Sequence, residues 1–283
     1  MCHNGLMFKI VFPIILFFVF TNTGFVRAVI VLQGNPVLLN INEIDDVSDV
    51  KTVNFNNKPV PIFAYNKKLI SLVGIDLNQK PGGYGFVYEL QNGDVYARLI
   101  RVQARQKPQE EIGIPQKLGG NTEQAQTALV SNLSSENSVL ANLYTGFKNF
   151  WSEPFQYPIQ NSTITGEYGY IRETGDYFIN HKGVDFRARE GTSVKSMNRG
   201  VVRLVKDFTV YGKTVVIDHG LGAMSMYMHL SKAIVNQGEL VLAGQVIGLS
   251  GSTGYAENPH LHLSVRIDNV SVDPIEFLRL FSS

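Results

Sequence analysis

The chain has 283 residues, 44% of them apolar and 17% charged, which are ordinary fractions for a globular protein of one large or two modest domains. Its formal net charge is +1 at neutral pH, and a balance this close to zero gives no electrostatic case for a nucleic-acid partner. Glycine is abundant, with 26 residues, and Phe and Tyr are frequent, with 17 and 12 residues. This composition favours β-structure with many tight turns.

Residues 1–28 have the pattern of a secretory signal peptide. Lys9 precedes an apolar run over 10–20, and a short polar segment then ends at Ala28. The run is shorter than the roughly 20 residues of a membrane span, so we expect export to the periplasm or cell envelope, or secretion, with no integral span after cleavage. An uncleaved anchor is the alternative. Cleavage changes the net charge to −1 and removes Cys2, the only cysteine, which excludes disulfides, thiol catalysis and sulfur ligation of zinc.

Residues 29–107 predict an immunoglobulin-like β-sandwich of about seven short strands. Turns are expected at 56–57 and 80–85, and the strands on either side of 92–94 are expected to form a hairpin. The proline-containing segment 59–63 fits an edge strand, where a missing backbone N–H is tolerated. This part of the sequence contains no histidine and no catalytic constellation.

Residues 108–155 predict a connector that contains a helix. Thr122 is a candidate cap, and leucines and aromatic residues follow it at spacings of three and four. We expect 134–135, two serines, and Gly146 to interrupt the helix. Its apolar stripe is expected to pack against one of the two flanking domains.

Residues 156–283 read as almost wholly β and contain the candidate chemistry. His260 and His262 lie in an alternating strand pattern, which places both imidazoles on one face. Such a pair can ligate a metal together, or one can ligate while the other moves a proton. The stretch 248–254 is rich in glycine but precedes no helix, so we interpret it as the wall of a cleft and not as a phosphate loop.

Three further histidines belong to this region. His181 lies four residues before Asp185, and His229 follows an apolar strand. A catalytic zinc needs three protein ligands and an open position, which two histidines and one carboxylate would supply, leaving two histidines for acid–base work. His219, beside a glycine, is interpreted as structural.

In this order the motifs resemble those of the lysostaphin-type (LytM-like) zinc metalloendopeptidases, which cut peptidoglycan cross-bridges and stem peptides. The resemblance covers about 155–280. The matching stretches are His181-Lys182-Gly183-Val184-Asp185-Phe186, Ile217-Asp218-His219-Gly220, Tyr227-Met228-His229-Leu230, Gly251-Ser252-Thr253-Gly254 and His260-Leu261-His262-Leu263.

The resemblance implies one zinc ion per chain, bound by His181, Asp185 and His262 at the floor of a β-sheet groove. It implies that His229 and His260 are the catalytic pair, one moving a proton for a metal-activated water and the other steadying the oxyanion, with the assignment of the two roles left open. The implied partners are peptidoglycan peptides. The overall expectation is a mainly β protein with an N-terminal sandwich, a helical connector over 108–155 and a metallopeptidase domain over 156–283.

The sequence departs from the family pattern at 166–172, before the first ligand. A tyrosine of the groove wall, for which Tyr168 and Tyr177 are candidates, has no secure position. Two alternatives to an active peptidase stay open, a catalytically silent protein that binds cell wall or activates an amidase, and an adaptor that binds a partner through 29–107. A further hypothesis is that the N-terminal domain occludes the groove of the same molecule.

Overall fold

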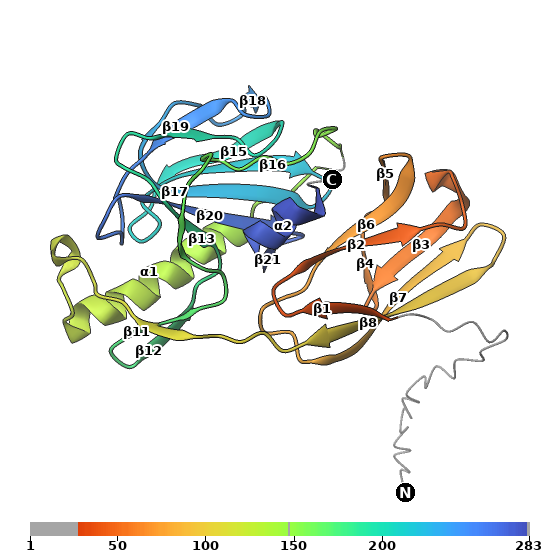
Figure 1. Ribbon diagram of the computed structural model, residues 1–283, viewed down its shortest axis with the longest axis horizontal. Helices are drawn as coiled ribbons and strands as arrows, with labels where there is room; N and C mark the ends of the chain where they lie inside the picture. Colours follow the sequence, from red (N-terminus) through yellow and green to blue (C-terminus); the bar gives the residue numbers. More distant parts are fainter. Residues whose placement is uncertain (1–27, 147, 282–283) are drawn as a thin grey trace, which may run out of the picture.

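The structure, a computed structural model, describes residues 28–146 and 148–281 and is mainly β (Figure 1). Of the predicted signal peptide, all but Ala28 lies outside the described residues. Within the described part of the chain, no helix has the length and apolar character needed to cross a membrane.

The first two sheets confirm the predicted β-sandwich. A five-stranded sheet has the order β1-β8-β7-β3-β4, and a three-stranded sheet has the order β2-β6-β5. Side chains from both sheets share one core, which includes Leu39 and Val73 from one and Phe86 and Ile100 from the other. The elements are β1 (Val29–Leu32), β2 (Pro36–Ile41), the 3-10 helix η1 (Val47–Asp49), β3 (Val50–Phe55), β4 (Lys58–Pro59), β5 (Phe63–Tyr65), β6 (Lys68–Gly74), β7 (Gly82–Leu90) and β8 (Val95–Gln103).

The turns of this sandwich follow the sequence in all but one place. The turn at 56–57 has positive φ at both residues, β7 and β8 form the expected hairpin, and Pro59 lies in β4 at the edge of its sheet. The prediction of a turn over 80–85 is wrong, because β7 begins at Gly82 and pairs with β8 from that residue. The strand leaves little room for a side chain at Gly83, because a Cβ there would lie 3.0 Å from the Leu99 side chain.

The connector contains β9 (Gln109–Glu111), the 3-10 helix η2 (Gln116–Leu118) and α1 (Glu123–Ala141). Thr122 caps α1 as predicted, since its hydroxyl accepts from the Ala125 N–H. The expected interruption at 134–135 is wrong, and α1 is continuous. Both serines are exposed, so their weak helix propensity costs little, whereas Leu129 and Leu140 are buried on the opposite side.

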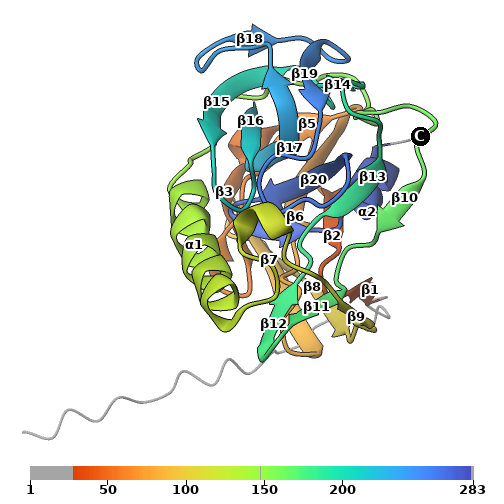
Figure 2. The same ribbon diagram turned by 90° about the vertical axis from the view of Figure 1, so that its left-hand side faces the viewer.

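The third sheet has ten strands and supports the site. Its main path is β10-β13-β20-β17-β16-β15-β18, with β14, β19 and β21 attached. Leu140 of α1 packs with Val216, Met224 and Met226, so α1 covers one face of β16 and β17 (Figures 1 and 2). The strands are β10 (Ile164–Gly166), β13 (Val184–Arg187), β14 (Ser193–Lys195), β15 (Gly200–Asp207), β16 (Lys213–Gly220), β17 (Ala223–Ala233), β18 (Leu240–Val241), β19 (Val246–Ser250), β20 (His260–Ile267) and β21 (Val270–Val272).

A small fourth sheet joins the connector to this part of the chain. It has the order β12-β11-β9, where β11 is Ile171–Thr174 and β12 is Tyr177–Asn180. The parallel β9–β11 pairing attaches the connector beside the segment that leads to His181 (Figure 2). The chain ends in α2 (Pro274–Leu280), which Asp273 caps through the N–H groups of residues 275 and 276.

The N-terminal sandwich packs beside α2 and β21 (Figure 1). Trp151 contacts Phe63 and Phe281 edge-on, at ring-centroid distances of 5.7 and 5.0 Å. Arg105 and Asp273 form an ion pair of 3.0 Å across the same junction. Trp151, a residue of the connector, lies in this junction. The border between connector and peptidase domain near residue 155 therefore stays a prediction.

Candidate metal and catalytic site

Strand register brings two of the predicted ligands together. β13 and β20 are antiparallel, and Asp185 lies opposite His262. His181 lies just before β13, in the short connection that follows β12, and its ring is directed at the same point. The three side chains are almost completely buried, with exposed fractions of 3% for His181, 6% for Asp185 and 7% for His262.

The ligand atoms of these residues form one compact group. His181 Nε2 lies 3.2 Å from Asp185 Oδ1 and 3.1 Å from His262 Nδ1, and the last two atoms are 2.7 Å apart. All the candidate ligand atoms lie within 4.8 Å of one another. This is the group that the sequence predicted, and it is a metal-binding set of two imidazoles and one carboxylate.

The outer hydrogen bonds of both imidazoles indicate what the inner atoms can bind. His181 Nδ1 lies 2.7 Å from the Glu167 carbonyl oxygen, so Nδ1 bears the proton and Nε2 bears a lone pair. The Ser264 hydroxyl donates to the Lys182 carbonyl, so it accepts from His262 Nε2 and leaves a lone pair on Nδ1. Two lone pairs and a carboxylate oxygen therefore face one another. A cation satisfies all three, and this donor set fits zinc.

His229 and His260 complete a group of four imidazoles. The His229 ring lies 4.9 Å from that of His260 and 6.0 Å from that of His262, measured between centroids. His229 Nδ1 is 2.8 Å from the Thr253 carbonyl oxygen, and His260 Nδ1 is 2.8 Å from that of Asn258. In both rings Nδ1 is therefore the donor, and Nε2 is left with a lone pair that can accept a proton.

An unusual backbone conformation directs His229 to this place. Its φ is +60°, in the left-handed region, at an irregularity in the pairing of β16 with β17. Its N–H donates to the Tyr211 carbonyl at 3.0 Å, and the carboxylate of Glu136 in α1 accepts from the N–H groups of Val210 and Tyr211. Such a conformation costs about 1–3 kcal/mol, so these bonds hold His229 against strain.

Arg172 of β11 supports the metal group from behind. Its guanidinium donates to Asp185 Oδ2, the oxygen that is turned away from the histidines, and to Glu110 Oε1 at 3.0 Å. Gly166 makes room for this contact, because a Cβ there would lie 2.5 Å from Asp185 Oδ2. The 166–172 segment therefore orients a ligand. Sequence reasoning missed this role, and it missed Glu110 in the connector.

Glycine is also required within the His-x-x-x-Asp stretch. A Cβ at Gly183 would overlap His262 Nε2 and would lie 2.6 Å from the Leu263 carbonyl oxygen. The close approach of the backbone at Gly183 is what lets His181 and Asp185 reach His262 from the same side.

Burial controls the charge of the site. It lowers the pKa of His262 to about 4 and, together with the neighbouring His260 and His262, that of His229 to about 3, so both rings are neutral at pH 7. Burial alone would raise the pKa of Asp185, but His181 and His262 hold it well below its usual value, so the carboxylate is ionised. Neutral imidazoles and an ionised carboxylate are the forms that ligate a metal.

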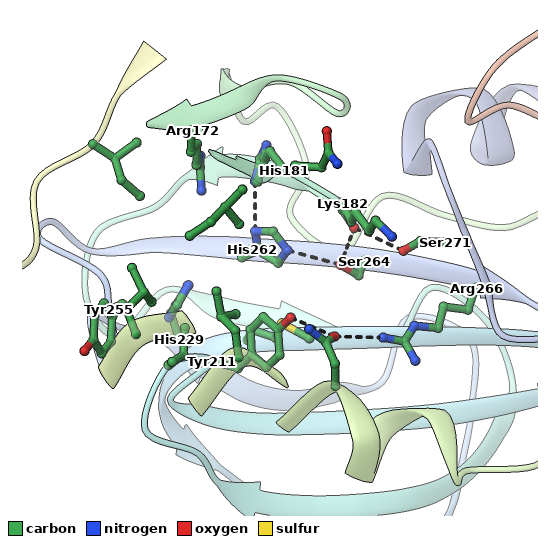
Figure 3. Close-up of a pocket in the computed structure, with 18 of the residues that line it drawn as sticks. Arg172, His181, Lys182, Tyr211, His229, Tyr255, His262, Ser264, Arg266 and Ser271 are labelled. Carbon is green, nitrogen blue, oxygen red and sulfur yellow. Dashed lines mark hydrogen bonds between the residues drawn. The ribbon is translucent and has the colours of Figure 1, made fainter. Parts of the chain in front are cut away.

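Two pockets meet at this group. One, of about 580 Å³, includes His181 and His262 in its lining, and another, of about 480 Å³, includes Asp185 and His260. His229 lines both pockets. Figure 3 shows the first of them, with His229 facing His262 across it. An extended chain that ran from one pocket to the other would cross the metal group.

The remaining predictions about tyrosines and His219 have clear outcomes. Neither Tyr168 nor Tyr177 lines these pockets, because the Tyr168 hydroxyl donates to the Ser271 carbonyl in the interior and the Tyr177 hydroxyl lies near Thr127. Tyr255, which directly follows the glycine-rich stretch, lines both. His219 is buried with partners on both ring nitrogens, as expected for a structural residue.

Comparisons with known proteins agree with this geometry. The model of peptidase family M23 matches residues 179–274. The chain is 46% identical to the peptidoglycan DD-endopeptidase ShyA of Vibrio cholerae over 82 residues, which cover 29% of this chain and 19% of ShyA. It is 39% identical to the glycyl-glycine endopeptidase ALE-1 of Staphylococcus capitis over 107 residues, which cover 35% of this chain and 29% of ALE-1.

The solved structure of a peptidase M23 protein from Pseudomonas aeruginosa shares the fold, with a TM-score of 0.64 at 24% identity, over 87% of this chain and 94% of that one. The chain spans less than a third of the length of ShyA and of ALE-1. The match to the family model nevertheless contains all three members of the metal group and both neighbouring histidines. Residues 179–274 are therefore a peptidase family M23 domain, which confirms the resemblance drawn from the motifs.

Proposed function

We propose that this protein is a zinc-dependent endopeptidase that hydrolyses peptide bonds of bacterial peptidoglycan. The observation that carries the proposal is the convergence of two imidazole lone pairs and an ionised carboxylate beside two further imidazoles, between two pockets. The names of ShyA and ALE-1, an endopeptidase of peptidoglycan and a glycyl-glycine endopeptidase, support this substrate class.

His181, Asp185 and His262 would hold the zinc ion. When bound, it would polarise a peptide carbonyl and lower the pKa of a water molecule to near 7. His229 and His260 then do the proton work, since each has Nε2 free and Nδ1 fixed on a carbonyl. The ring that accepts a proton becomes an imidazolium, which can stabilise the developing oxyanion and return the proton to the leaving amine.

The test is mass spectrometry of the peptides released from purified sacculi by zinc-loaded protein, with His229→Ala as the control. The proposal predicts new amino termini on cross-linked peptides with the wild-type protein and none with the control. The identity of the new terminus separates cleavage after D-alanine from cleavage between glycines. Intact sacculi, with one zinc bound per chain, would contradict the proposal and favour a silent protein that binds the wall or activates an amidase.

The site of action is proposed to be outside the cytoplasm. The signal-peptide pattern of residues 1–28 supports export, and the substrate class lies in the cell envelope. Fractionation of cells that express the full chain tests this, and recovery of the protein in the cytoplasm with residues 1–28 intact would contradict it.

We further propose that the connector restricts access to the groove. Ile112 and Gly113 line both pockets, and the Ile112 N–H donates to the Glu173 carbonyl at 2.9 Å. The Lys117 ammonium donates to the carbonyl of Ser252, in the glycine-rich stretch that precedes the pocket-lining Tyr255. These contacts support a restriction by the connector, and Asp76 of the sandwich also lines the larger pocket.

Variants Ile112→Ala and Lys117→Ala test the restriction. We expect both to raise the rate on intact sacculi more than the rate on short soluble peptides, since bulky substrates need the wider groove. Arg199→Ala, at an exposed residue outside both pockets, is the control. Equal rates for wild type and both variants on sacculi would contradict occlusion.

A further inference from the structure

The larger pocket extends past the metal group along β20. His262, Ser264 and Arg266 alternate on one face of this strand, and all three line the pocket. At about 3.3 Å per residue, Arg266 lies about 13 Å from His262. Lys182 and Ser271 line the same end, on the side of His262 that is away from Tyr255 (Figure 3).

Arg266 is a half-buried cation without an acidic partner. In the described ranges 28–146 and 148–281, no ion pair joins it to Asp or Glu, and the one hydrogen bond of its side chain, to Asn137 Oδ1, is long at 3.4 Å. That amide oxygen already accepts from the Tyr211 hydroxyl at 3.0 Å. Burial lowers the pKa of Arg266, and no carboxylate opposes this effect. Even a half-buried guanidinium is stabilised by an anion beside it.

Arg172 in the same pocket shows the usual arrangement, because it is paired with both Asp185 and Glu110. Asp268, two residues after Arg266, does not fill this role. Its pKa is raised by burial with no opposing contribution from a cation. The missing partner of Arg266 is therefore not supplied by its neighbours in sequence.

The rest of this end of the pocket is also suited to an anion. The side chain of Lys182 is exposed, lines the pocket and has no ion pair within the part of the chain that the structure describes. Asn137 and Asn269 supply amide groups. Asp76 is the one acidic residue in the lining, and its carboxylate accepts from the Asn78 N–H at 2.7 Å.

We propose that Arg266, with Lys182, binds a carboxylate group of the peptide substrate, about four backbone units from the bond that is cut. The inference rests on the proposed function for the identity of the ligand as a peptide. A guanidinium suits a carboxylate because its N–H groups can donate to both oxygens. A chain extended over β20 covers about 3.3–3.6 Å per residue, so four units span the distance from the metal group.

The test is a binding experiment in the His229→Ala background, which prevents turnover. The ligands are a cross-linked peptide purified from sacculi and derivatives with one carboxylate at a time converted to the amide. We expect one of these amidations to weaken binding about tenfold or more, and Arg266→Gln to weaken binding of the unmodified peptide by a similar factor. For that amidated peptide, Arg266→Gln should cause no further loss.

Arg199→Gln, at an exposed arginine outside the pocket, should bind every peptide as the parent does. Arg266→Lys should recover part of the affinity, and Lys182→Gln, at an exposed position, should give a smaller loss for the same carboxylate. If Arg266→Gln lowers the thermal midpoint of unfolding, its loss of binding can reflect lost stability. The binding of Lys182→Gln alone then decides whether the proposal holds. Losses that are independent of amidation, or no loss with either variant, would overturn the proposal.

The outcome is separate from that of the endopeptidase test. Hydrolysis of sacculi without coupling between Arg266 and a carboxylate removes only this subsite. Coupled binding without hydrolysis supports the subsite and contradicts the endopeptidase.

Discussion

His219 in β16 and His262 in β20 are both buried in the same sheet, but their surroundings differ. His219 has a carbonyl oxygen 2.9 Å from one ring nitrogen and the Ser225 hydroxyl 2.7 Å from the other, so both ring nitrogens have a partner within the protein. His262 has a partner for its outer nitrogen, but its inner nitrogen faces another acceptor, His181 Nε2, at 3.1 Å. Burial lowers the pKa of His219 and of His262 to about 4.

The comparison shows that burial and a lowered pKa do not identify a functional histidine. What differs is the direction of the unused lone pair. The His219 network closes on itself, whereas the outer bonds of His181, His262 and their two neighbours all leave lone pairs that point inward. An arrangement of this kind is stable only with a cation or protons at its centre.

Removal of a metal ligand is expected to have the largest effect. His262→Ala leaves two protein ligands, so we expect loss of bound zinc at micromolar free metal and loss of hydrolysis by several orders of magnitude. Metal analysis after gel filtration and the sacculus assay measure these effects. His219→Ala should keep one zinc per chain. A loss of zinc in this variant would show that His219 is not independent of the metal group.

Removal of a proton carrier should separate chemistry from metal binding. His229→Ala is expected to retain zinc but to lose about 10²–10⁴-fold in kcat, the range for a lost general acid–base residue. His260→Ala should behave in the same way, because the wild-type His260 Nε2 also lies beside the metal group, 3.7 Å from Asp185 Oδ1. If both variants kept wild-type kcat, the two rings would have no catalytic role.

The closed His219 network predicts a dependence of stability on pH. Its pKa is about 4 in the folded protein and 6.5 as the unperturbed value, so the unfolded chain binds more protons between these limits. Stability is therefore full above pH 6.5 and falls as the pH decreases towards 4, by about 3 kcal/mol from this residue. In urea unfolding at pH 7 and 4.5, His219→Gln should lose less stability than wild type. Equal losses would contradict the assignment.

The smallest expected effect concerns the residue behind the metal group. Arg172→Gln removes the donor to Asp185 Oδ2, and we expect zinc affinity to fall about 10–100-fold, as is usual for residues that orient a ligand. Competition with a chelator measures the change. Arg203→Gln, which removes the arginine paired with buried Asp218, is the matched control and should leave zinc affinity unchanged. Equal affinities for Arg172→Gln and wild type would show that the pair is not needed.

The sequence predicted the parts of the site that depend on local pattern. The period of two in 260–263 places His260 and His262 in one strand, and the motif order links them to His181 and Asp185 through the family resemblance. The assignment of His229 and His260 as the catalytic pair stays a prediction. Thr122 as a helix cap and the hairpin around 92–94 were confirmed because each depends on chemistry within a few residues.

The parts that the sequence did not predict depend on contacts between distant segments. Arg172 reaches Glu110 through the parallel pairing of β9 with β11, and no local signal gives that register. The positive φ of His229 depends on Tyr211 and on Glu136 of α1. The helix interruption at 134–135 was wrong because packing of the opposite face outweighs two weak serines.

The most direct test of the central claim is an anomalous-diffraction map at the zinc edge from crystals of the zinc-loaded protein. We expect one peak per chain, about 2.0–2.2 Å from His181 Nε2, Asp185 Oδ1 and His262 Nδ1. A peak at other residues would contradict the proposed metal site, and so would ligation through His181 Nδ1 or His262 Nε2, the nitrogens that donate outward.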